Sequence, residues 1–293
     1  MPPIRPLRFL VLLAALVALA SSTDGREYRR MPWHLADVWW TLEREAELKE
    51  FSIDVEFETD VGREVRLFIA PIGLVTLDET KAYAGFQNRS RIDEQGAEGM
   101  RVIFSRWGER RRDHIRPEPG GLWESGGYEG DFISVRKVYP WRPGRYAMSL
   151  IRLDGDDADP PGAWVRLRVC FTLDERCESA GALKFPGTAL RLKRQFASFV
   201  EIFGPAIDPD TIPKGSVVIG NVRVNGEKAR LASASAYYPK DVPHYATARS
   251  AGEDRVRIEF GIADDKSGLP RNQSGTLYRP LFGGPSAEPR QSR

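Results

Sequence analysis

Residues 51–58 read FSIDVEFE, with an apolar side chain at every second position. Phe51, Ile53, Val55 and Phe57 alternate with polar residues. A period of two places the two sets on opposite faces of an extended strand, whereas a helix needs a period of 3.6. The segment is therefore predicted to be a strand with one buried face.

The same alternation recurs along most of the chain. It returns in segments 65–69, 102–107, 132–138, 146–153, 164–171, 196–203, 217–224 and 256–260. Clusters of Gly, Pro and Asp between them, such as 154–162 and 204–215, are typical of turns. Only residues 42–49 favour a helix, and that window is short. The pattern predicts an all-β fold, an antiparallel β-sandwich or jelly roll.

The 293 residues suffice for one large or two smaller domains. Pro205 and Pro209 suggest a linker between two domains. We expect a main β-sandwich over 21–205 and a smaller C-terminal β unit over 206–264. Residues 265–293 are rich in Ser, Gly, Pro, Arg and Gln and are expected to be disordered.

The first twenty residues have the layout of a signal peptide. Arg5 and Arg8 precede an apolar run at 9–20, and Ala18-Leu19-Ala20 fits a cleavage site. An uncleaved membrane anchor is the alternative, but a spanning helix needs about 20 apolar residues. No later segment is apolar enough to span a bilayer. The sequence thus predicts cleavage of residues 1–20 and export to the periplasm or the medium.

Cleavage would remove two of the 43 basic residues and leave 41 against 41 acidic ones. A neutral chain argues against nucleic acid as a partner, because that affinity comes from a surplus of Lys and Arg. The two cysteines, Cys170 and Cys177, have a spacing that suits a disulfide across a hairpin in an oxidising compartment. A metal site is the alternative, but no His or second Cys pair lies nearby.

Several catalytic motifs are absent from the sequence. No serine has the flanking glycines of a nucleophile elbow, and no glycine-rich loop has the Lys and Ser/Thr of a P-loop. The segment 154–159 gathers four carboxylates, but Ala158 and Val165 stand where an EF-hand needs ligands. We interpret it as an acidic turn and expect no cofactor. The alternative is an irregular calcium site at Asp154, Asp156, Asp157 and Asp159.

Aromatic residues near turns are the best candidates for ligand contacts, because Trp and Tyr combine a flat apolar face with a polar edge. The segment LWESGGYEGDF at 122–132 combines such residues with glycines and carboxylates. The predicted ligand-binding residues are Arg106, Trp107, Trp123, Glu124, Tyr128, Glu129, Asp131 and Trp141. Among these, Glu124, Glu129 and Asp131 would be the paired carboxylates of a glycoside hydrolase or lyase.

The order of five motifs resembles an exported bacterial family, domain of unknown function 3472. The motifs are YAGFQ (83–87), IFSRWG (103–108), GGYEGDF (126–132), WRPGRY (141–146) and FASFVEIFG (196–204). The resemblance covers about residues 35–205 and departs at Tyr128, within the glycine-rich motif. It implies a secreted β-sandwich in polysaccharide-degrading or cell-surface contexts, and it brings no catalytic residues.

Three functions are consistent with these patterns. The leading hypothesis is a non-catalytic protein that binds a poly- or oligosaccharide. The alternatives are a structural or protein-interaction module of the cell envelope and a polysaccharide-cleaving enzyme. In a eukaryotic secretory route, Asn88 and Asn272 would also be glycosylation acceptors.

Overall fold

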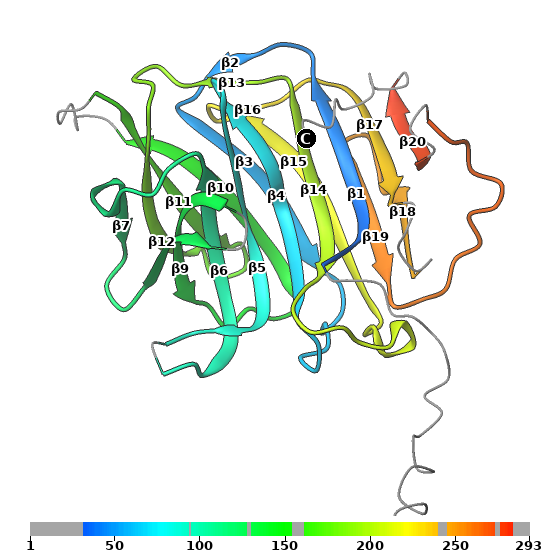
Figure 1. The fold of residues 1–293 in the computed structure, drawn as a ribbon. Helices are drawn as coiled ribbons and strands as arrows, with labels where there is room; N and C mark the ends of the chain where they lie inside the picture. Colours follow the sequence, from blue (N-terminus) through cyan, green and yellow to red (C-terminus); the bar gives the residue numbers. More distant parts are fainter. Residues whose placement is uncertain are drawn as a thin grey trace, which may run out of the picture.

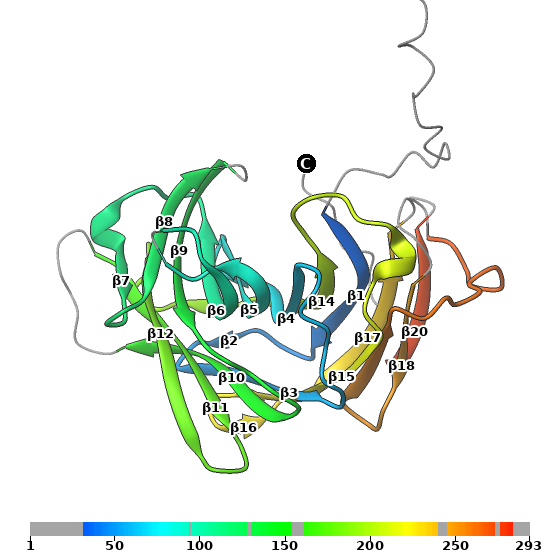
Figure 2. The ribbon, with the colours of Figure 1, turned by 90° about the horizontal axis from the view of Figure 1, so that it is seen from below.

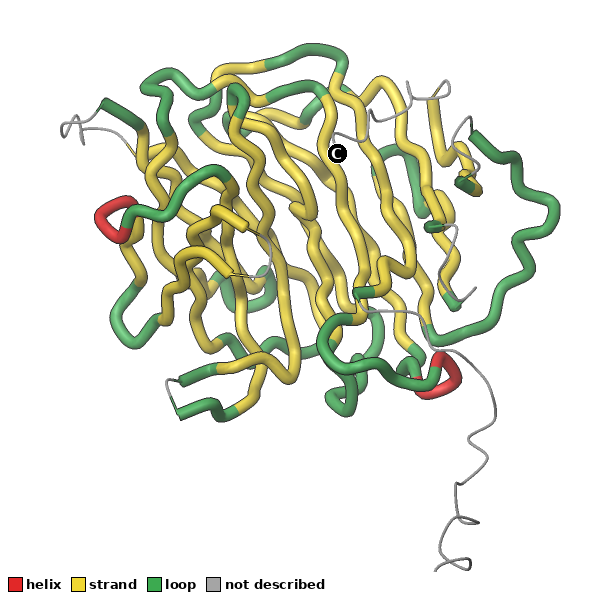
Figure 3. Tube along the Cα trace, viewed as in Figure 1, coloured by secondary structure: helices red, strands yellow, loops and turns green. Residues whose placement is uncertain are grey.

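The computed structural model describes residues 32–93, 95–127, 130–153, 161–239, 245–272 and 276–283. These residues form twenty strands and two 3₁₀ helices of three residues, η1 (Arg112–His114) and η2 (Pro209–Thr211) (Figure 3). The strands build two large antiparallel sheets, which confirms the predicted all-β sandwich.

The larger sheet has eleven strands, with the path β20-β17-β1-β14-β4-β5-β6-β9-β8 (Figure 1). Two short strands, β2 and β13, lie beside this path. The bounds are β1 (Trp33–Leu42), β2 (Ala46–Glu47), β4 (Leu67–Leu77), β5 (Thr80–Arg91), β6 (Glu98–Trp107), β8 (Leu122–Gly127), β9 (Gly130–Val138), β13 (Arg191–Leu192), β14 (Gln195–Ile202), β17 (Leu231–Tyr238) and β20 (Leu277–Gly283).

The smaller sheet has nine strands, with the path β18-β19-β15-β3-β10-β11-β12-β7 and β16 beside β15. Its bounds are β3 (Glu50–Phe57), β7 (Ile115–Pro117), β10 (Gly144–Leu153), β11 (Ala163–Phe171), β12 (Arg176–Phe185), β15 (Gly215–Val224), β16 (Glu227–Lys228), β18 (Ala246–Ser250) and β19 (Arg255–Phe260). Strand β3 holds the alternating segment 51–57, and β10 and β15 pair with it on either side.

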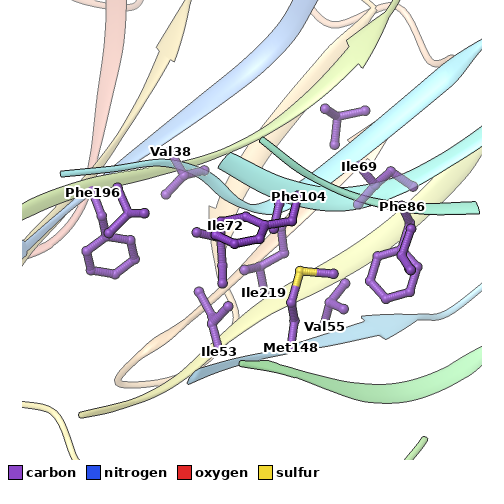
Figure 4. Packing of buried hydrophobic residues seen from close by; sticks show 14 of the residues in the cluster. Val38, Ile53, Val55, Ile69, Ile72, Phe86, Phe104, Met148, Phe196 and Ile219 are labelled. Carbon is purple, nitrogen blue, oxygen red and sulfur yellow. The ribbon is translucent and has the colours of Figure 1, made fainter. Parts of the chain in front are cut away.

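The two sheets pack face to face around one hydrophobic core. Ile53 and Val55 of β3 point across to residues of the larger sheet such as Ile72 (Figure 4). Figure 2 shows that the larger sheet is strongly curved, with the smaller sheet covering its convex side. The opposite face of the larger sheet is therefore concave, and the strands of the smaller sheet do not cover it.

The strands after residue 205 join the same two sheets as those before it. Strand β15 pairs with β3 in the smaller sheet, and β17 pairs with β1 in the larger one. Within 265–293, where the sequence predicts disorder, residues 277–283 form β20, which pairs with β17 and extends the larger sheet. Residues 284–293 and the predicted signal peptide lie outside the described residues.

The predicted disulfide between Cys170 and Cys177 is confirmed. The two residues face each other across the β11–β12 hairpin, with their Cα atoms 4.0 Å apart. The acidic segment 154–160 lies outside the described residues. Among the described residues, neither 3₁₀ helix has the length or hydrophobicity of a transmembrane span.

Replacing both cysteines with serine is expected to lower the free energy of unfolding by about 2 kcal/mol, because the bond restricts a short loop of the unfolded chain. Urea unfolding of the oxidised wild type and the double variant would measure the difference. A reducing agent should shift the wild-type midpoint and leave the variant unchanged. Equal midpoints for the oxidised wild type and the variant would contradict the expectation.

Candidate functional site

The concave face of the larger sheet carries a hydrophobic cluster separate from the core. Its buried members are Phe68, Ala70, Tyr83, Ile103 and Phe199, and the partly buried Trp107 and Phe203 pack against them. Consecutive residues are buried along much of β4 and β5, so side chains on both faces of these strands are shielded from solvent. Because this apolar cluster lies on the sheet face that the smaller sheet leaves uncovered, the face is a candidate binding surface.

Two glycines allow aromatic rings to lie close to this sheet. A Cβ atom at Gly73 would overlap the ring of Phe199. A Cβ atom at Gly85 would lie 2.6 Å from Cε2 of Phe68 and 2.5 Å from the carbonyl oxygen of Ile69. Without side chains at these positions, the two rings lie close to the sheet, edge to face with centroids 5.3 Å apart, and form an aromatic floor.

An open cleft of about 450 Å³ lies over this floor. We call it the cleft. Its aromatic lining consists of Trp39, Phe68, Tyr83, Trp107, Phe199 and Phe203. Its polar lining includes His34, Asp37, Gln87 and Glu201. A concave, mostly apolar cavity with a few polar groups is the usual form of a ligand site.

A bulge in β1 brings two polar residues of the cleft together. The register against β14 shifts between His34 and Ala36. In a regular strand, residues three apart point to opposite faces, but one extra residue restores them to the same face. Nδ1 of His34 thus lies 2.8 Å from Oδ1 of Asp37, and its Nε2 lies 3.5 Å from Oε2 of Glu201.

These two carboxylates determine the protonation of His34. Burial alone would lower the pKa of the imidazole, but the charge and hydrogen bond of Asp37, together with the charge of Glu201, raise it from 6.5 to about 9. His34 therefore carries a positive charge at neutral pH, in contact with the ring of Phe199 at a centroid distance of 4.6 Å.

The ring signals of His34 are expected to titrate near pH 9 in an NMR experiment. Because the folded-state pKa is raised, the contribution of this ion pair to stability is complete below pH 6.5 and is lost as the pH rises through about 9. The stability advantage of the wild type over His34→Gln should decrease over the same range. A midpoint at or below the ordinary value of 6.5 would contradict this geometry.

Of the residues predicted from the sequence, Trp107 lines the cleft. Its ring lies 4.9 Å from that of Tyr83, centroid to centroid. Glu124 lies opposite Ser134 in the β8–β9 pair and forms an ion pair with Arg136. Ser134 in turn lies opposite Ser105 of β6, so Glu124, Ser134 and Ser105 are on the same face of the sheet.

Trp123 is on the other face of β8. It lies opposite the fully buried Val135, and the guanidinium of Arg112 covers its ring at 4.5 Å. Trp141 lies in the core, only 2 % exposed and stacked on Phe57 at 4.5 Å. Neither ring therefore reaches the cleft.

The predicted polar residues are separated as well. Arg106 is buried on the core side of β6, where it contacts Glu109 at 3.3 Å and the ring of Phe185. Asp131 is exposed and forms an ion pair with Arg110, whereas Glu124 forms one with Arg136. The two carboxylates therefore do not share an arginine. Tyr128, Glu129 and the four aspartates of the acidic turn lie outside the described residues. Within the described residues, no group of three or more His, Cys, Asp or Glu could hold a metal ion.

Comparison with known proteins does not change this description. No protein-family model and no curated protein matches the chain.

Proposed function

We propose that this chain is an exported protein that binds a polysaccharide in the cleft. The observation that carries the proposal is the pairing of aromatic faces with polar groups on one concave surface. Trp39, Tyr83 and Trp107 offer flat apolar faces, while Gln87 and Glu201 offer hydrogen-bonding atoms beside them. Sugar rings present the matching combination of apolar faces and hydroxyl edges.

The form of the cleft supports a chain-like ligand. The cleft is open and lies on a concave face that the smaller sheet leaves free (Figure 2). An oligosaccharide segment can lie along such a surface and extend beyond it. A flat outer face without a cleft would instead favour the structural or protein-interaction module.

Binding of the full chain to a panel of soluble polysaccharides, measured by affinity electrophoresis, would test the proposal. At least one polysaccharide should retard the wild type. Trp107→Ala should weaken its binding roughly 10- to 100-fold, because burying a large apolar side chain against a ligand contributes about 1.5–3 kcal/mol.

Trp123→Ala is the matched control. It removes a tryptophan from the same region, but from the face of β8 opposite the cleft, and it should bind as the wild type does. Loss of binding in Trp123→Ala with normal binding in Trp107→Ala would contradict the proposed site, and so would a panel without any retardation.

Cleavage of the bound polysaccharide is a second candidate function. It is favoured by the protonated His34 in the wall of the cleft, because a charged imidazole can donate a proton to a departing sugar oxygen and take one back from the water that adds to the anomeric carbon. Incubation with the bound polysaccharide should then release new chain ends, and His34→Gln should abolish the release. Intact polysaccharide after prolonged incubation would leave binding as the function.

A further inference from the structure

A second cavity, rich in arginine, adjoins the cleft. It has a volume of about 320 Å³, and we call it the basic recess. Arg66, Arg89, Arg91 and Arg101 line it, with Glu98 as the one carboxylate among its described lining residues. Phe203 lines both cavities.

The arginines of the basic recess are incompletely neutralised. Arg66 and Arg89 share the carboxylate of Glu98. Neither Arg91 nor Arg101 forms an ion pair with a carboxylate of the described residues. Four guanidinium groups therefore face one carboxylate, and the surplus of positive charge lies at the edge of the cleft.

Arg101 connects the basic recess to the cleft. Its side chain is only 5 % exposed, and it donates from Nε to Oε1 of Gln87 at 2.9 Å. Its Nη1 donates to the backbone carbonyl of Arg91 at 2.7 Å. Since Gln87 lines the cleft, a ligand there lies next to a fixed and nearly buried guanidinium.

The surroundings of Arg101 disfavour its charge when no ligand is bound. Burial, followed by the nearby charge of Arg136, lowers the pKa of Arg101 to about 8. A bound anion would offset both effects, because an opposite charge within a few ångströms favours the ionised form. Guanidinium groups also match the paired oxygens of carboxylates and sulfates.

We infer that the basic recess binds the anionic substituent of an acidic polysaccharide whose sugar rings lie in the cleft. This inference rests on the proposed function and specifies its ligand class. The shared chemistry is an oxyanion on the sugar ring, either the carboxylate of a uronic acid or a sulfate ester.

Two matched pairs of polysaccharides would test the inference with the full chain. One pair is polygalacturonate and its carboxyl-reduced form, and the other is dextran sulfate and dextran. The anionic member of at least one pair should bind at least about tenfold more tightly than its neutral partner. Added salt should weaken the binding of the anionic member only. A preference in the first pair identifies the uronate, and one in the second identifies the sulfate.

Arg91→Gln is the decisive variant, because Arg91 is exposed and its replacement leaves the core intact. It should weaken binding of the anionic member about five- to tenfold and leave the neutral member unchanged. Arg101→Gln should have the larger effect, provided that its thermal unfolding shows a folded protein. Arg166→Gln is the control, because Arg166 is an exposed residue of β11 in the smaller sheet.

Two results would overturn the inference in different ways. Trp107-dependent binding without preference for either anionic member, or a preference that persists in Arg91→Gln and Arg101→Gln, rejects the basic recess and leaves the proposed function standing. The absence of Trp107-dependent binding to any polysaccharide rejects both.

Discussion

Trp141→Ala is expected to lower the free energy of unfolding by about 3–5 kcal/mol, because it removes a large buried ring and leaves a cavity. The ring of Trp141 stacks on Phe57 at 4.5 Å and meets the edge of Phe86 at 6.0 Å. Phe57 belongs to the smaller sheet and Phe86 to the larger, so the loss would loosen contacts between the two. Equilibrium unfolding in urea would measure the change.

Trp123→Ala is the comparison for this prediction. Trp123 is 44 % exposed, so its removal should cost less than about 1 kcal/mol. The folded fraction of Trp141→Ala should still bind polysaccharide as the wild type does. Reduced affinity with unchanged stability would show that Trp141 contacts the ligand, contrary to its position in the core.

Gly85→Ala is expected to destabilise the protein by about 3 kcal/mol, as overpacking does, and to weaken polysaccharide binding as well. The added methyl group would lie 2.5 Å from the carbonyl oxygen of Ile69 and 2.7 Å from Cα of Ala70, both in the backbone of β4. Backbone atoms in a central strand cannot move aside as a flexible side chain does. The ring of Phe68 would also be displaced from the floor of the cleft.

Urea unfolding and affinity electrophoresis would measure the two effects of Gly85→Ala. Gly268→Ala is the matched control, because a Cβ atom there meets no atom within 4 Å. The control should change stability by less than about 0.5 kcal/mol and leave affinity unchanged. Wild-type stability in Gly85→Ala would contradict the close packing of β5 against the backbone of β4.

The strands and the disulfide could be predicted because each depends on local pattern. The alternation at 51–57 reappears as β3, and the spacing of Cys170 and Cys177 as a cross-strand pair. The domain boundary predicted near residue 205 also rested on local composition, namely its prolines. Local composition, however, does not reveal that the next strand, β15, pairs with β3, far away in sequence.

The cleft could be predicted only in part. Trp107 and Trp141 have similar neighbours in sequence, with Arg and Gly close to each. Their different positions depend on which strand or loop carries each ring and on what packs against it. The sequence does not predict His34, Asp37 and Trp39 as cleft residues. Their positions depend on the pairing of β1 with β14 and on a bulge in β1 that no motif marks. The alternation of WHLADVWWTL at 33–42 was the one available signal.

The indole NH signals of the seven tryptophans offer the most direct test of where the ligand binds. An NMR titration of the wild type with the retained polysaccharide, with signals assigned by single substitutions, would follow each ring separately. We predict that the signals of Trp39 and Trp107 shift on binding, while those of Trp123 and Trp141 do not. Shifts of Trp123 with unchanged signals from Trp39 and Trp107 would contradict a polysaccharide site in the cleft.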